Sequence, residues 1–174
     1  VGTIHGFCIA KLREYWPDEY HNFDILDEGA RIALILRGYN GLLGLRALQQ
    51  QTGQGQYATI ESFAQAYDQL HEHNRFDIRL PPSDPPHELG EVESAWCKDA
   101  KLLTPVGDPE VSVAFACSAA RYYAYLRCRR FLDFSTSQSE FIRRLRSDRR
   151  QLRTLSQRQI HLVVDEVQDI NPVQ

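Results

Sequence analysis

Acidic residues that directly follow a short apolar run, near the end of the chain, could bind a metal and activate water. Residues 160–164 read I-H-L-V-V, a short and largely β-branched run that predicts a buried strand. Asp165 and Glu166 follow this run, and Gln168 and Asp169 come shortly after them. At the carboxyl end of a buried parallel strand, one carboxylate can hold Mg²⁺ through its waters while its neighbour polarises an attacking water. For an isolated Asp-Glu pair, a strand that ends in a charged surface loop is the common alternative.

The pattern around this acidic pair extends well beyond the two carboxylates. Residues 163–174 read V-V-D-E-V-Q-D-I-N-P-V-Q and closely resemble motif II, the Walker B element, of UvrD/Rep-like superfamily 1 DNA helicases. The family pattern is roughly V-D-E-x-Q-D-T-N-x-x-Q. Val167 stands where an aromatic residue is usual, and Ile170 stands where Thr is usual. Neither departure replaces a residue that would bind metal or water.

This resemblance implies an ATP-driven motor that moves 3′ to 5′ along single-stranded DNA and separates duplexes. ATP and Mg²⁺ are the implied cofactors. Asp165 would bind the Mg²⁺ of MgATP, and Glu166 would act as the base for the attacking water. Gln168 would sense the γ-phosphate and couple it to DNA, with Asp169 supporting the loop.

A second pattern stands at the start of the chain. Residues 3–13 read T-I-H-G-F-C-I-A-K-L-R, and their apolar positions recur at helical spacing. From the residues alone, Thr3 is a candidate helix cap and His5 a surface imidazole. The segment also resembles the T-F-H-S-x-x-x-x-x-L-R motif of the same helicases, which implies that Thr3 and His5 contact the backbone of single-stranded DNA. Gly6 stands where the family often has Ser.

Two shorter segments complete the resemblance. Residues 23–28, F-D-I-L-D-E, resemble the F-x-I-L-D-x-x-D segment that opens the accessory 1B domain of these helicases. Residues 132–135, L-D-F-S, resemble the family's L-D-F-D-D-L more weakly, because Ser135 and Thr136 replace both following acids. All four segments fall in the helicase order, so we expect the chain to be a helicase fragment. Residues 40–108 resemble nothing that we can name.

Composition narrows the class of protein. Hydrophobic residues make up 43% and charged residues 25% of the 174 residues, values typical of a globular protein. No apolar run approaches the ~18 residues that span a bilayer. The four cysteines lack C-x-x-C spacing, which predicts free thiols and a cytoplasmic location rather than a zinc site. The sequence contains no Met and no G-x-x-x-x-G-K-[ST], so we expect a piece of a longer protein that does not hydrolyse ATP by itself.

The net charge of −3 hides a strong asymmetry along the chain. Residues 1–111 carry 9 basic and 17 acidic side chains, whereas residues 112–160 carry 11 basic side chains, all Arg, and 3 acidic ones. Guanidinium groups bind phosphates with paired donors, so this block predicts a salt-sensitive nucleic-acid surface. A solvated helical face is the alternative. The expected DNA contacts are Arg143, Arg144 and Arg146.

Helical periodicity dominates the remaining sequence. Helices are expected near residues 3–16, 29–37, 59–74, 87–103, 110–130 and 137–155, with a polar loop at 49–56. Tyr122, Tyr123 and Tyr125, within 110–130, could stack on bases or lie in the core. The expected fold class is mainly α, with a helical 1B-like accessory domain inserted in a RecA-like α/β motor domain of which only flanking pieces are present.

The expected domain division follows from these landmarks. Residues 1–20 would be a first piece of motor domain 1A, 21–155 the helical insert, and 156–174 the motif II strand and loop of motor domain 1A. Expected partners are single-stranded DNA and duplex junctions, with DNA-repair proteins as further candidates and no membrane. Two alternatives stay open. A helicase–nuclease of the RecB/AddA kind carries the same motifs, and a non-motor protein could keep the fold only to bind nucleic acid or a partner.

Overall fold

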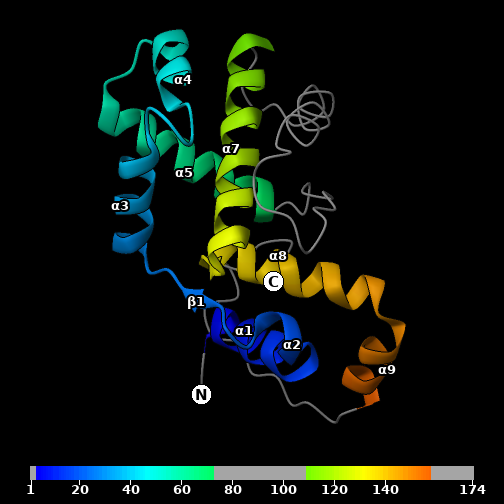
Figure 1. Ribbon diagram of the computed structural model, residues 1–174. Coiled ribbons are helices and arrows are strands. Elements are labelled where there is room, and N and C mark those ends of the chain that lie inside the picture. Colours follow the sequence, from blue (N-terminus) through cyan, green and yellow to red (C-terminus); the bar gives the residue numbers. More distant parts are fainter. Residues whose placement is uncertain (1–2, 73–108, 158–174) are drawn as a thin grey trace.

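The structure, a computed structural model, describes residues 3–72 and 109–157 as eight helices and one small sheet (Figure 1). In chain order the elements are α1 (Ile4–Tyr15), α2 (Pro17–Tyr20), β1 (Asp24–Ile25), α3 (Glu28–Gly38), α4 (Leu45–Thr52), α5 (Gln56–Glu72), α7 (Pro109–Arg129), β2 (Phe131–Leu132), α8 (Phe134–Ser147) and α9 (Arg149–Gln157). The predicted mainly helical class is therefore confirmed for these residues. The helix predicted at 87–103 and the predicted terminal strand lie outside them.

The sheet joins the two shorter helicase-like segments, those at residues 23–28 and 132–135. β1 and β2 are parallel, with Asp24 opposite Phe131 and Ile25 opposite Leu132. The pairing extends past the strands, because the backbone N–H of Leu26 donates to the carbonyl of Leu132 at 2.8 Å. Neither strand was predicted, since a strand of two residues shows no alternating pattern in the sequence.

Each strand leads directly into a helix that begins at an aspartate. Asp27 Oδ1 accepts from the backbone N–H of Ala30 at 2.8 Å, and Asp133 Oδ1 accepts from that of Thr136 at 2.8 Å. An aspartate at this position satisfies an amide that the helix itself cannot pair, and it complements the helix dipole. Asp27 thus caps α3, and Asp133 caps α8 in the same way.

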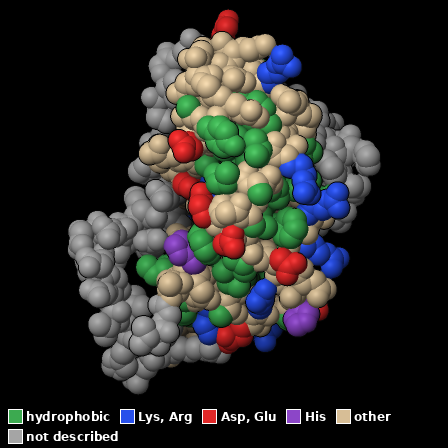
Figure 2. All heavy atoms as spheres, turned by 90° about the vertical axis from the view of Figure 1, so that its left-hand side faces the viewer, with side chains coloured by type: hydrophobic (Ala, Val, Ile, Leu, Met, Phe, Trp, Pro, Cys, Tyr) green, Lys and Arg blue, Asp and Glu red, His purple; other side chains and the backbone are tan. Residues whose placement is uncertain are grey.

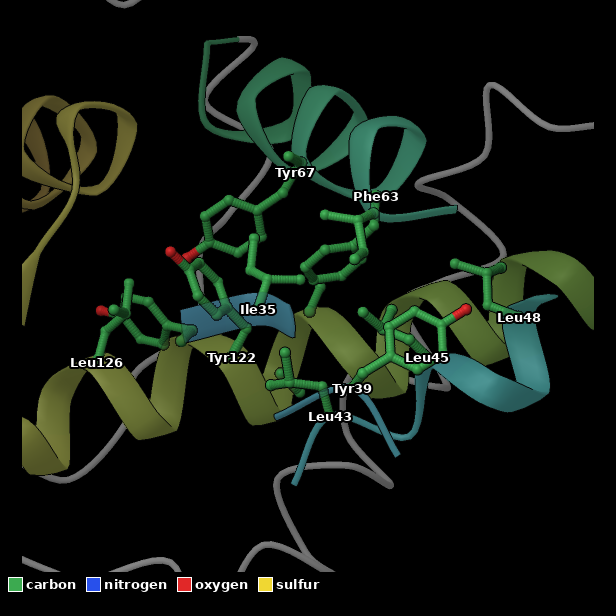
Figure 3. Close-up of a cluster of buried hydrophobic side chains, with 14 of the residues drawn as sticks. Ile35, Tyr39, Leu43, Leu45, Leu48, Phe63, Tyr67, Tyr122 and Leu126 are labelled. Atoms are coloured by element: carbon green, nitrogen blue, oxygen red, sulfur yellow. The ribbon is translucent and has the colours of Figure 1, made fainter. Parts of the chain in front are cut away.

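One hydrophobic core lies between α3, α4, α5 and α7, where the labelled side chains point toward one another (Figure 3). Tyr67 of α5 and Tyr122 of α7 meet edge to face, with ring centroids 4.9 Å apart and an interplanar angle of 85°. Phe63 adds a second edge contact to Tyr122 at 5.9 Å. Of the two interpretations of the tyrosines on α7, the core interpretation is confirmed for Tyr122 and Tyr123, which are buried.

A second hydrophobic core joins the start of the chain to its arginine-rich part. Its buried members come from α1, α2, β2 and α8 and from the turn before β1: Cys8, Leu12, Tyr20, Phe23, Leu132 and Phe141. Leu155 of α9 packs on the edge of this cluster. In Figure 1, α1 and α2 accordingly lie below α8, while α3, α4 and α5 lie beside α7. The predicted domain boundaries at residues 20 and 155 stay a prediction.

The predicted polar loop at 49–56 was wrong, because residues 45–52 form α4. The sequence signal was hidden by the run of glutamines, whereas the helix is held by Leu45 and Leu48, both buried in the first core. Gly44 and Gly53 bound the helix, each in the left-handed backbone conformation that glycine adopts most readily.

The single helix predicted at 137–155 was also wrong in its extent. α8 begins earlier, at Phe134, and the chain breaks at Asp148 before α9 begins. The side chain of Asp148 accepts from the backbone N–H groups of Arg150 and Gln151, both at 3.1 Å, so it starts a new helix where the periodic pattern alone indicated one continuous helix.

The face of the molecule that lies on the left of Figure 1, where α3 and α4 run, carries hydrophobic side chains beside charged ones (Figure 2). Leu36 of α3 is among the exposed large hydrophobic residues, with 39% of its surface accessible. Scattered exposed leucines of this kind are normal on protein surfaces.

We expect the two glycines around α4 to differ in their tolerance of alanine. Both Gly44→Ala and Gly53→Ala should cost about 1 kcal/mol, because an L-residue is strained in the left-handed region. Gly44→Ala should cost slightly more, since its new Cβ would lie 2.5 Å from Arg121 Nη1 and the end of that side chain would have to shift, whereas Gly53 has nothing within 4 Å. Urea unfolding of the two variants tests this difference, and equal losses of stability would contradict it.

Candidate nucleic-acid interface

Thr3 stands at the start of α1 and caps it. Its Oγ1 accepts from the backbone N–H of Gly6 at 3.1 Å, and the residue is exposed. Capping uses an oxygen lone pair and not the hydroxyl hydrogen, so the same hydroxyl can still donate to a phosphate. A Cβ at Gly6 would lie 3.3 Å from Thr3 Oγ1, which places Gly6 directly against the cap. The cap predicted from the residues is confirmed, while the DNA contact stays a prediction.

His5 is the second residue of α1 and is half-buried against α8. Its ring centroid is 4.9 Å from that of Phe134, the first residue of α8. Burial lowers the pKa of His5, and the nearby Asp68 opposes this shift only in part. The imidazole is therefore mainly neutral at pH 7, so it would meet a phosphate as a hydrogen-bond donor rather than as a full positive charge.

The three arginines that were expected to contact DNA, Arg143, Arg144 and Arg146, have different surroundings in the structure. Arg143 Nη2 donates to Glu140 Oε2 at 2.6 Å. Arg144 forms an ion pair with Glu19 and also donates through Nε to the hydroxyl of Tyr20 at 3.2 Å. Arg146 is exposed. Arg144 therefore joins α8 to α2, whereas Arg143 pairs within α8. A DNA contact by any of the three stays a prediction.

Glu140 is the centre of this ionic cluster, although only 2% of its surface is exposed. Its carboxylate accepts hydrogen bonds from the hydroxyls of Tyr20, at 2.5 Å, and Tyr123. Arg127 Nη1 lies 3.5 Å from Oε2, and Arg143 pairs with the same oxygen. Partners from α2, α7 and α8 thus converge on one buried charge.

The charge state of Glu140 follows from these neighbours. Burial alone would raise the pKa of Glu140, but Arg127 and Arg143 outweigh burial and hold the pKa below its usual value. The pKa values of Tyr20 and Tyr123 are raised, first by burial and then by the Glu140 carboxylate, so both phenols keep their protons. The sequence reading missed this cluster, and the spacing Glu140-x-x-Arg143 on a helix was the available signal for part of it.

A second buried polar cluster lies where β2 meets α8. Arg31 of α3 pairs with Asp68 at 2.9 Å and lies 3.7 Å from Asp133, the residue that caps α8. The hydroxyl of Tyr122 donates to Asp133 at 3.0 Å, and that of Ser135 donates to Asp68 at 2.5 Å. Asp133 and its neighbours therefore tie the start of α8, against which His5 packs, to the first core.

The motif II residues predicted to do the chemistry, Asp165, Glu166 and Gln168, lie outside the described residues. Within 3–72 and 109–157, no group of three or more His, Cys, Asp or Glu side chains is arranged to hold a metal ion. None of the helices in these two ranges is both long and apolar enough to cross a membrane.

Comparison with known proteins identifies the family. The model of the UvrD/REP helicase N-terminal domain matches residues 1–174, which is the whole chain. The chain therefore belongs to the UvrD/REP helicase N-terminal domain family, as its four motifs predicted, and is related to superfamily 1 helicases. Membership of this family implies the use of ATP and the binding of DNA. No curated protein and no solved structure matches the chain.

We expect Glu140→Gln to be among the most destabilising substitutions in the described structure. It removes the buried counter-charge of Arg143 and one of the two carboxylates that pair with Arg127, a kind of change that typically costs about 3–5 kcal/mol. The pKa of Glu140 is lower in the folded than in the unfolded protein, so the stabilisation is present above about pH 4.5 and disappears as pH falls through the folded-state pKa. The difference in unfolding free energy between wild type and variant should shrink accordingly.

Urea unfolding between pH 3 and pH 8 gives this difference, with Glu14→Gln as the control. Glu14 is an exposed partner of Lys11, so its loss should cost less than about 0.5 kcal/mol. Burial lowers the pKa of His71 to about 4, so both proteins should lose stability as pH falls from 6.5 toward 4. The Glu140 carboxylate itself raises the pKa of His71, so this loss should be somewhat larger in Glu140→Gln than in Glu14→Gln. A Glu140→Gln variant as stable as Glu14→Gln would contradict the role of the cluster.

Proposed function

We propose that the chain is part of an ATP-dependent 3′ to 5′ DNA helicase and contributes to both of its sites. Thr3 and His5 contact single-stranded DNA, and Asp165 and Glu166 are the carboxylates that act on MgATP. The observation that carries this proposal is the family match over residues 1–174, together with an intact D-E-x-Q-D motif at 165–169. A chain kept only as a binding module has no use for that motif.

The proposed roles at motif II follow the chemistry of the side chains. Bound Mg²⁺ would supply charge that stabilises the transferred phosphoryl group. Asp165 holds that ion, and Glu166 accepts a proton from the attacking water. Gln168 links the state of the nucleotide to the DNA-binding surface. The sequence contains no G-x-x-x-x-G-K-[ST] phosphate loop, so we expect no DNA-dependent hydrolysis from the 174 residues by themselves.

The described structure supports the proposed DNA contact at the start of α1. Thr3 is exposed at the helix N-terminus, where backbone amides and the helix dipole favour an anion. His5 is held in place by Phe134 and by the packing of α1 on α8. A contact built on a packed helix keeps its geometry, which a translocating motor requires at each step.

We expect Glu166→Gln to remove ATP hydrolysis from the complete helicase while nucleotide binding remains. Loss of a general base typically slows turnover by about 100-fold or more. The measurement is steady-state hydrolysis with and without single-stranded DNA, beside binding of a fluorescent ATP analogue. Glu61→Gln, an exposed substitution on α5, is the matched control and should behave as wild type.

The outcomes separate the functional alternatives. DNA-stimulated hydrolysis that collapses only in Glu166→Gln supports the motor and its base together. Hydrolysis that survives the substitution removes Glu166 from this role. A complete protein that binds DNA but hydrolyses no ATP would favour the non-motor alternative.

We expect His5→Ala to weaken binding of single-stranded DNA by about tenfold, which corresponds to roughly 1.4 kcal/mol and to the loss of one hydrogen bond to a charged group. His21→Ala is the control, because His21 is an exposed histidine at the end of α2. Fluorescence anisotropy with a labelled oligothymidylate measures both variants, and thermal unfolding checks that each is folded. Equal affinity of the two variants would remove His5 from the DNA path.

A further inference from the structure

The short helix α9 carries a group of arginines that the fold leaves exposed. We call Arg149, Arg150 and Arg153 the α9 arginine patch; all three are exposed. Arg149 and Arg153 are four residues apart and Arg150 is three residues before Arg153, so their side chains neighbour one another on the helix surface. Among the described residues, these three guanidinium groups have no ion-pair partner.

Three other arginines of this block form ion pairs inside the fold. Arg127 and Arg144 both pair with Glu19, and Arg143 pairs with Glu140. The carboxylates in these ion pairs are those of Glu19 on α2 and Glu140 on α8. Some of the excess positive charge between residues 112 and 160 is therefore balanced by carboxylates of the fold. The charge on the exposed arginines of α9 is not balanced by any carboxylate of the described residues.

No acidic residue lies within α9 to offset its charge. The sequence of the helix, R-R-Q-L-R-T-L-S-Q, has three arginines and no carboxylate. The nearest acid in sequence, Asp148, is directed at the backbone N–H groups of Arg150 and Gln151. Its charge thus complements the N-terminus of the helix, and none of the other carboxylates within residues 3–72 and 109–157 pairs with these three guanidinium groups.

The patch has a defined position on the molecule. Leu155 of α9 packs against the second core, which also contains α1 and α8, and α9 continues directly from the end of α8 (Figure 1). His5 packs against the first residue of α8, so the patch and His5 lie toward opposite ends of that helix. A helix of 14 residues is about 21 Å long, so a substitution in the patch leaves the surroundings of His5 unchanged.

We propose that the α9 arginine patch binds the phosphate backbone of the DNA strand on which the helicase acts; this inference rests on the DNA-binding part of the proposed function. The three guanidinium groups present paired donors that match phosphate oxygens. The chain as a whole is acidic, with a net charge of −3, so it needs a local positive surface to hold DNA. The proposed DNA contacts are accordingly Arg149, Arg150 and Arg153. Arg143 and Arg144 are held in ion pairs instead.

The test compares two triple variants that remove the same charge. The test variant is Arg149→Gln, Arg150→Gln and Arg153→Gln; the control is Arg37→Gln, Arg46→Gln and Arg129→Gln, at exposed positions on α3, α4 and α7. Anisotropy of a labelled oligothymidylate of about 20 nucleotides is followed at stepped salt concentrations. Each lost phosphate contact lowers the salt slope by about 0.7, so the test variant should lose about 2 from its slope and bind at least about tenfold more weakly at low salt.

The result that supports the proposal is a loss of slope and affinity in the test variant that the control does not share. Equal behaviour of the two variants overturns it. Unchanged oligonucleotide binding, combined with patch-dependent binding of poly-L-glutamate, also overturns it and marks the patch as a surface for an acidic protein. Patch-dependent DNA binding in a protein whose hydrolysis survives Glu166→Gln leaves this inference standing and removes only Glu166 from its role as the base. No DNA binding by the wild type overturns both.

Discussion

The buried charge of Glu140 is the constraint on which the arrangement of the described helices depends. A carboxylate with 2% exposure is costly unless positive charge and hydrogen-bond donors surround it. Its partners come from α2, α7 and α8, so satisfying one side chain fixes three helices relative to one another. α2 follows α1 across a single residue, Trp16, and α1 packs with α8 in the same core. The position of Thr3 and His5 therefore depends on a charge far from them in the sequence.

The second constraint is the pairing of β1 with β2. Two residues on each side are enough, because both strands continue into helices capped by Asp27 and Asp133. Asp133 also accepts from Tyr122 and lies near Arg31, so the same residue starts α8 and joins it to the first core. The helicase-like segments at 23–28 and 132–135 are thus two halves of one structural unit.

Helix caps and long helices could be predicted from the sequence, because they depend on residues that are close together in the chain. The cap at Asp27 and the long helix at 109–129 follow from residue type and periodicity over a few turns. Long-range partners could not be predicted in this way, because Arg144 finds Glu19 across 125 residues of chain. An arginine-rich helix looks the same in sequence whether its charges meet phosphates or carboxylates. The structure shows that Arg143 and Arg144 meet carboxylates, whereas the arginines of α9 meet none in the part of the chain that the structure describes.

Only part of the candidate site lies within the described residues. Thr3, His5 and the arginines lie within the described residues, whereas Asp165, Glu166 and Gln168 are proposed as site residues from their resemblance to motif II and from the family to which the chain belongs. The most direct measurement is strand separation by the complete helicase on duplexes that carry a single-stranded tail at either the 3′ or the 5′ end. ATP-dependent separation of the 3′-tailed duplex alone is the predicted result. Failure to separate either duplex in the presence of ATP and Mg²⁺ would contradict the assignment of this chain to a 3′ to 5′ motor.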